Sequence, residues 1–209
     1  MGTLKVDNIQ KRDGTALITD GAASTNLLSE TALRSAGVGM ILLNTTTITS
    51  STASATIDSS ILTSDYDGYD IFIGGASPVT DSQNFKMKVS YDNGSTFFTD
   101  GYQGGSYNRL DNNTTAVLSQ GTGTLLDIPA FTHGNADYKE KSDLHITFFN
   151  TKETGVRARV EMQHRNANTY HYGAESYVFY NDEQIMNHLT FEYGSGNIAT
   201  AVIKVYGRT

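Results

Sequence analysis

The chain has 209 residues, of which 38% are hydrophobic and 18% are charged, and its formal net charge at pH 7 is -7. A nucleic-acid-binding protein needs Lys and Arg to displace counterions from phosphates, and 15 basic residues against 22 acidic ones disfavour that class. The chain contains no cysteine, which excludes disulfide bonds, cysteine metal sites and a thiol nucleophile.

The first residues, Met1 to Asp7, lack the apolar core of a secretory signal peptide. No stretch of the sequence approaches the roughly 20 apolar residues that span a bilayer. We therefore expect a chain that is made and folded in a cytoplasm and is not inserted into a membrane.

The first 21 residues predict a short two-stranded β element with a strong turn pair at Asp13-Gly14. Its apolar residues are Leu4, Val6, Ile9, Leu17 and Ile18. A hairpin of this size cannot bury its own apolar side chains and is marginal in water. It therefore needs a partner surface, either another copy of itself or another protein.

Residues 22–36 predict one short helix, which Ser24 or Thr25 could cap and Gly37 would end. Its apolar stripe consists of Leu27, Leu28, Ala32 and Leu33. We expect this stripe to pack between subunits rather than onto its own domain. Residues 1–39 are thus predicted to form an N-terminal attachment and oligomerisation arm, and residues 40–209 a single domain.

From residue 40 onward almost every segment predicts a β-strand. The clearest is 85–91, which alternates apolar and polar side chains and leads through Asn93-Gly94 into a second hairpin arm at 95–98. Other strands are expected at 40–43, 54–57, 69–73, 143–148, 156–163, 177–180, 188–193 and 201–206, with an exposed edge strand within 44–53. Such a series predicts a mainly β protein, an antiparallel β-sandwich of jelly-roll type. Pro78 and Pro129 are both expected in loops.

The segment 101–124 is predicted to be a long, polar, glycine-rich loop with one weak strand near 115–118. Long loops on a rigid sandwich are where binding residues concentrate. The chain has 12 tyrosines and no tryptophan. Tyrosine rings can stack on sugars and amides can bond sugar hydroxyls, although the same tyrosines could instead line a core or a subunit interface. The candidate glycan contacts are Tyr102, Tyr107, Asn108, Asn112, Tyr170 and Tyr172.

No pattern in the sequence predicts a metal site. His164 and His171 are seven residues apart, and Glu175 follows His171 by four, a spacing that brings ligands together only on a helix. The acidic run 65–70 resembles a calcium loop, but its twelfth position is Ala76. We interpret this run as an acidic turn that leads into a strand.

Catalytic patterns are equally weak. The sequence has no Gly-x-Ser-x-Gly nucleophile elbow, and no repeat of 20–50 residues of the kind that builds a β-helix. Paired carboxylates for glycan cleavage could come from Asp137, Glu140, Asp143, Glu161 or Glu175, but nothing in the sequence brings two of them together. We therefore expect a protein that is not an enzyme and that has no catalytic, cofactor-binding or metal site.

Three stretches resemble bacteriophage tail-fibre and virion structural proteins, especially those of marine and cyanobacterial phages. They are the opening 4–10 with 13–17, the domain start at 46–57 with 66–69 and 89–97, and the ending 196–199 with 203–207. The resemblance implies a virion protein that attaches through its N-terminal arm to other virion proteins, forms a homotrimer and recognises a host surface glycan. Because only residues 22–39 separate arm from domain, it implies a short fibre or fibre tip rather than a long fibre. A capsid decoration or head-fibre protein and a glycan-degrading tailspike enzyme are the alternatives.

Overall fold

The structure is a computed structural model, and the chain divides into two compact units, Met1–Ile41 with Thr209, and Leu42–Arg208. The residues that it describes are 9–10, 16–19, 22–23, 33, 36–37, 39–98, 102–110, 113–121, 126–133, 141–149, 157–166, 169–179 and 185–209. Within these ranges no helix is long and apolar enough to cross a membrane.

The first unit contains a three-stranded antiparallel sheet in the order β1 (Ile9–Gln10), β2 (Ala16–Thr19), β3 (Ala22–Ala23). Ile9 lies opposite Ile18, so the chain returns on itself as the sequence predicts. The third strand was not predicted. Leu4, Val6 and the turn pair Asp13-Gly14 lie outside the described residues.

The predicted helix over 22–36 is wrong at its start, because Ala22 and Ala23 form β3 and pair with Thr19 and Ile18. Strand pairing overrides the helix propensity of alanine here. Leu33 has a helical conformation and is half-buried, and Gly37 has a φ of 72°, as expected of a glycine that ends a helix. Leu27 and Leu28 lie outside the described residues.

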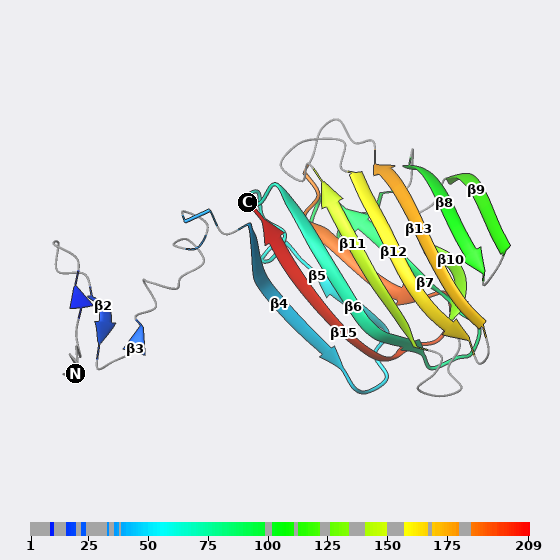
Figure 1. Cartoon of the computed structure of the whole chain (residues 1–209), viewed down its shortest axis with the longest axis horizontal. Helices are drawn as coiled ribbons and strands as arrows, with labels where there is room; N and C mark the ends of the chain where they lie inside the picture. The colour runs from blue at the N-terminus through cyan, green and yellow to red at the C-terminus, as the bar shows by residue number, and fades with distance from the viewer. Residues whose placement is uncertain are drawn as a thin grey trace, which may run out of the picture. The chain divides into compact units, whose positions relative to one another are not determined.

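The second unit is built from two antiparallel sheets in a β-sandwich-like arrangement (Figure 1). The larger sheet contains, in spatial order, β4 (Met40–Ile48), β15 (Ile198–Arg208), β6 (Gly68–Pro78), β11 (Ser142–Phe149), β12 (Arg157–Asn166), β13 (Thr169–Phe179), β8 (Tyr102–Leu110) and β9 (Asn113–Gly121). The smaller sheet contains β10 (Leu126–His133), β7 (Gln83–Ser90), β14 (His188–Tyr193) and β5 (Ser54–Ile57). The predicted mainly β, antiparallel fold is thus confirmed.

The core is made by alternate residues of both sheets. Buried apolar side chains of the smaller sheet include Phe85, Met87, Val89, Leu189 and Phe191, and those of the larger sheet include Ile71, Ile73, Leu144, Ile146, Phe148, Val160 and Met162. Successive side chains of a strand point to opposite faces, so each strand gives one apolar row to the interior. Burying one such side chain stabilises the fold by about 1.5–3 kcal/mol.

The predicted loop over 101–124 is wrong for most of its length. Its residues include β8 and β9, which pair with each other from Tyr102 opposite Gly121 to Leu110 opposite Asn113. Glycine and polar residues suggested a loop, but long antiparallel pairing compensates for their low strand propensity.

Both prolines were predicted in loops but lie in strands, and one strand continues past the glycine pair that was predicted to end it. Pro78 is the last residue of β6, and Pro129 lies inside β10, which is an edge strand with irregular register between Asp127 and Thr132. An edge position tolerates proline because one side of the strand needs no donor. The strand predicted to end before Gly74 continues through Gly75, whose φ of 62° accompanies a bulge opposite β11.

The turn at Asn93-Gly94 is confirmed, with φ values of 57° and 85°. The second arm of that predicted hairpin is not a regular strand. Phe98 donates one backbone hydrogen bond to Val89, at 2.8 Å, and residues 97–98 otherwise lie outside the sheet.

Candidate binding site on the outer face of the larger sheet

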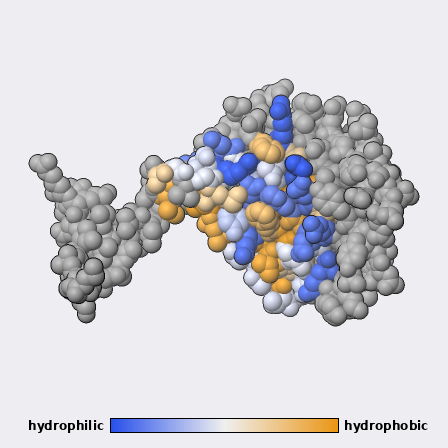
Figure 2. Space-filling view, in the orientation of Figure 1, coloured by the Kyte–Doolittle hydropathy of each residue, from blue (hydrophilic) through white to orange (hydrophobic). Residues whose placement is uncertain are grey.

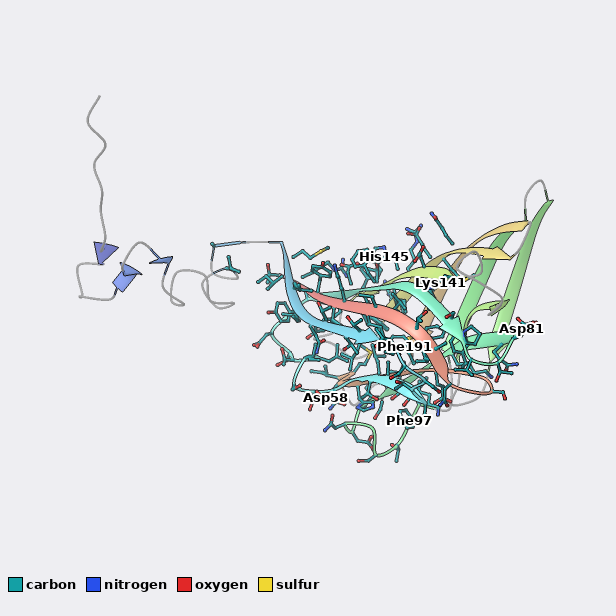
Figure 3. The ribbon with its side chains drawn as sticks, turned by 90° about the horizontal axis from the view of Figure 1, so that it is seen from below. Asp58, Asp81, Phe97, Lys141, His145 and Phe191 are labelled. Atoms are coloured by element: carbon teal, nitrogen blue, oxygen red, sulfur yellow. The ribbon has the colours of Figure 1, made fainter. Side chains whose placement is uncertain are left out.

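The outer face of the larger sheet is formed by the residues that alternate with the core residues of β6, β11 and β12. Register places Phe72 opposite His145, and His145 opposite Glu161. Antiparallel partners share a face of the sheet, so these three side chains form a row across three strands. Figure 3 shows His145 on the outer side of this sheet and Phe191 between the two layers.

Asp70 anchors this row although it lies on the outward side of β6, where it is only 4% exposed. Its Oδ1 accepts hydrogen bonds from His145 Nε2 at 2.7 Å and from the Thr147 hydroxyl at 2.9 Å. Its Oδ2 lies 3.0 Å from Nε of Arg208. A buried carboxylate is costly unless partners compensate for its lost hydration, so Asp70 fixes the positions of the groups around it.

His145 is held on three sides. Its ring stacks on Phe72 with centroids 4.2 Å apart and an interplanar angle of 10°. Its Nδ1 lies 4.0 Å from Glu161 Oε2, and Arg159 donates to the other oxygen of Glu161 at 2.5 Å. A carboxylate can only accept a hydrogen bond, so Nε2 of His145 is the donor to Asp70, and Nδ1 faces Glu161.

A shallow hollow of about 290 Å³ opens beside this row. Its lining residues are Phe72, Asp143, Leu144, His145, Glu161, Met162 and Gln163. Asp143 is fixed there because its Oδ1 accepts a hydrogen bond from the Gly75 amide at 2.8 Å. Phe72 remains 38% exposed at the rim. The hollow therefore combines an exposed ring with carboxylate and amide groups.

Two of the carboxylates considered from the sequence, Asp143 and Glu161, line this one hollow. The sequence alone could not bring them together, because their proximity depends on the pairing of β11 with β12. Asp143 lies opposite Gln163, and Glu161 is two residues before Gln163, so the two acids are diagonal neighbours. The backbone positions of diagonal neighbours on two antiparallel strands lie roughly 7–8 Å apart.

The same rows continue by register into β13 and β8. Gln163 lies opposite Tyr172, and Glu161 lies opposite Ala174, which in turn lies opposite Tyr107. Two residues predicted as glycan contacts, Tyr172 and Tyr107, thus hold register positions in line with Gln163 and Glu161.

The other candidate contacts are distributed more widely. Tyr170 lies opposite Arg165 in β12, and Tyr102 and Asn108 occupy β8 positions that alternate with Tyr107. Asn112 lies outside the described residues. The tyrosines and amides singled out from the sequence therefore do not form one cluster by register.

Register also places His164 directly opposite His171, a pairing that the sequence spacing did not indicate. Among the residues whose side chains the structure describes, no group of three or more His, Asp or Glu could hold a metal ion. The acidic run 65–70 ends in β6 and contributes Asp70 to the network described above.

A second polar cluster occupies the turn after β7. The Asp92 carboxylate accepts hydrogen bonds from the Thr96 hydroxyl at 2.6 Å, from the Thr96 amide at 2.8 Å and from the Ser90 hydroxyl at 2.7 Å. These donors, those of Thr96 first, lower the pKa of Asp92 to about 2. All of these bonds are internal to the turn, so we interpret the cluster as structural.

The residues of the outer-face network were not identified as a site from the sequence. Their signal was present in the polar members of the alternating strands, but it requires the register between strands to be read. A scan against protein-family models finds no match to this chain, and neither does a search of the curated proteins. The functional argument therefore depends on the fold and on this face.

Proposed function

We propose that the chain is a non-enzymatic structural protein of a bacteriophage virion, a short tail fibre or fibre tip that attaches the particle to the host surface. The observation that carries the proposal is the strand order of the second unit, taken with the resemblance of its opening, middle and ending to virion proteins. Fold alone does not determine function, so the strand order supports this proposal by analogy.

The strand order supports a jelly roll. Four strands of the larger sheet lie in the order β4-β15-β6-β11, and the smaller sheet reads β5-β14-β7-β10. Numbered one to eight along the chain, these strands give sheets 1-8-3-6 and 2-7-4-5, the order of an eight-stranded jelly roll. The pairs β8–β9 and β12–β13 are additions to it, and they lengthen the larger sheet. Jelly rolls recur in viral capsid and lectin domains.

Assembly into a homo-oligomer, which we propose to be a trimer, is supported by the ends of the larger sheet. Its terminal strands β4 and β9 each have nine residues, with no charged residue and no proline. Soluble proteins usually protect long edges with charges, prolines or short strands. The smaller sheet is protected in this way, since β5 has four residues and β10 contains Asp127 and Pro129.

Exposed apolar side chains at the β4 edge also support assembly into an oligomer. Leu42 of β4 is 50% exposed and Val202 of the neighbouring β15 is 37% exposed. Figure 2 views this face and shows hydrophobic residues interspersed with hydrophilic ones. The N-terminal arm, through Leu4, Val6, Ile9, Leu17, Ile18, Leu27, Leu28 and Leu33, is proposed to supply the remaining subunit and virion contacts.

Two experiments test this proposal. Electron microscopy of the particle with a label on this protein should place it on the tail; a position on the head would favour the capsid decoration alternative, and absence from the particle would refute the virion role. Light scattering should show a trimer that is lost when residues 1–39 are removed. A truncated chain that kept the full oligomer would refute the role of the arm.

A glycan-degrading enzyme remains the second candidate because Asp143 and Glu161 line one hollow. Inverting glycosidases use two carboxylates, held roughly 6.5–9.5 Å apart, as general acid and general base. Incubation of the purified protein with host envelope polysaccharide distinguishes the two candidates. The proposed function predicts no new reducing ends, and their appearance would contradict it.

A further inference from the structure

The hollow beside Phe72 and His145 has the chemistry of a sugar site. An exposed aromatic ring can cover the apolar C–H face of a sugar, while planar carboxylate and amide groups can bond its hydroxyls. Phe72 supplies the ring: one of its faces stacks on His145 and Tyr206 lies perpendicular to it with centroids 5.6 Å apart, so a sugar would contact the 38% of the side chain that stays exposed. Asp143, Glu161 and Gln163 supply the planar polar groups. We propose that this hollow binds a neutral saccharide. The inference rests on the proposed function and deepens it by naming the site and the class of ligand.

The charge of the lining decides which sugars fit. The hollow is lined by two carboxylates and by no Lys or Arg, and the whole chain has a formal net charge of -7. Two guanidinium groups of this face are already paired, that of Arg159 with Glu161 and that of Arg208 with Asp70, and Lys204, opposite Phe72 on β15, does not line the hollow. A sugar that carries a carboxylate or a phosphate would meet like charge in the hollow and be repelled. Neutral hexoses and N-acetylated hexosamines remain.

The network beneath the hollow keeps its lining groups in place before a ligand arrives. The 2.7 Å hydrogen bond that His145 Nε2 donates to Asp70 fixes the His145 ring, and this ring in turn stacks on Phe72. A solvent-facing sheet surface does not need a carboxylate that is only 4% exposed, because burying a charge costs free energy. Binding sites do need such support, because groups already in position lose less entropy when the ligand binds.

The strand register indicates that a ligand would lie across the strands, along a row of paired residues. The row of side chains Phe72, His145 and Glu161 crosses β6, β11 and β12. Neighbouring strands lie about 4.8 Å apart, so the two steps from β6 to β12 span about 10 Å. This length accommodates about two linked sugar rings across the strands. We therefore expect oligosaccharides to bind more tightly than the corresponding monosaccharides.

The test uses the purified full chain on an array of defined oligosaccharides, half of them neutral and half bearing sialic or uronic acids, at pH 7 and physiological salt. We expect binding to neutral members only. Affinity for the best neutral probe is then measured by titration calorimetry. Failure to bind any neutral probe, or a preference for acidic ones, would overturn the proposal.

Two variants with a matched control locate the binding. Phe72→Ala should weaken binding at least about tenfold, because it removes the apolar contact of the hollow. Gln163→Ala, at an exposed position, should weaken it several-fold without a change in folding. Phe149→Ala is the control, since Phe149 is 39% exposed on the same face against 38% for Phe72 and does not line the hollow. Equal losses in Phe72→Ala and Phe149→Ala would overturn the assignment of the site.

The role of Asp70 has its own readout. Asp70→Asn should weaken saccharide binding and also change the ¹⁵N NMR signals of the His145 ring, because the carboxylate no longer selects the Nε2 proton. Weaker binding without a change in the ring signals would contradict its role in holding His145.

The results of these experiments distinguish a failure of the saccharide site from a failure of the proposed function, on which the inference rests. A protein that is on the virion but binds no neutral saccharide would refute the hollow and leave the virion role intact. A protein that binds neutral saccharides through Phe72 but is absent from the particle would refute the virion role and leave the hollow. If this face is instead covered by a second copy of the chain, Phe72→Ala would alter the oligomer and not the binding, which refutes the site.

Discussion

The same three strands, β6, β11 and β12, form the inner and outer faces of this part of the sheet, but the two faces differ in which residues they bury. On the inner face every described residue from Leu144 to Phe148 that points inward is apolar and at most 3% exposed. On the outer face a carboxylate, Asp70, is almost as deeply buried, while the aromatic Phe72 beside it is exposed. Hydrophobic alternation determines the inner face of β11 from Leu144 to Phe148, whereas the outer face is determined by which polar groups the register places together.

The largest expected loss of stability comes from a comparison of two adjacent residues, Phe148 and Phe149, that lie on opposite faces of the larger sheet. Phe148 is fully buried, and Phe148→Ala should lower the free energy of unfolding by about 3–5 kcal/mol. Phe149, 39% exposed, has the Arg208 guanidinium 4.8 Å from its ring centroid, so Phe149→Ala should cost about 1 kcal/mol or less. Urea denaturation of both variants measures the difference. Similar losses would mean that the two faces are not distinct.

The next largest expected loss of stability tests whether Asp70 and His145 on the outer face act together. Asp70→Asn should destabilise the fold by about 1.5–3 kcal/mol, because hydrogen bonds to a charged group are lost. His145→Gln should cost less, since the side chain of His145 is 34% exposed. A double-mutant cycle should give a coupling free energy of about 0.5–3 kcal/mol between the two sites. Additive losses would show that Asp70 and His145 do not act together.

The inner face could be predicted from the sequence, and the outer face could not. Alternation in 85–91 and 156–163 identified Phe85, Met87, Val160 and Met162 as core residues because a period of two needs only the local sequence. The Asp70–His145 contact joins residues 75 positions apart, so it depends on strand order and register. Neither follows from local pattern.

The same limit explains the misassigned segment over 101–124. Its glycines and asparagines suggested a loop, yet β8 pairs along its whole length with β9 and with β13. Pairing with two neighbours satisfies its backbone groups whatever its side chains are. Local composition therefore underestimates strands whose stability comes from distant partners.

A smaller effect is expected on the outer face of the smaller sheet, where Lys88 and Glu192 form an ion pair at 2.9 Å, with both side chains 23% exposed. A partly exposed ion pair contributes about 0.2–1 kcal/mol, and salt screens it. The coupling of Lys88→Met with Glu192→Gln should be about 0.5 kcal/mol and should fall in 1 M NaCl. A coupling as large as that of Asp70 with His145 would remove the distinction between this ion pair and the network around Asp70.

The smallest expected effect is a dependence of stability on pH at the exposed Asp92, which belongs to neither face. Hydrogen bonds from Thr96 and then Ser90 lower its pKa from 3.8 to about 2, so the ionised form is favoured in the folded state. The resulting stabilisation is present above the unfolded pKa and is lost as pH falls from about 4 to about 2. NMR titration of the Asp92 carboxyl should give a midpoint near 2, and Thr96→Val, which removes the hydroxyl but keeps the amide, should raise it. An unchanged midpoint in Thr96→Val would show that the hydroxyl is not the main cause.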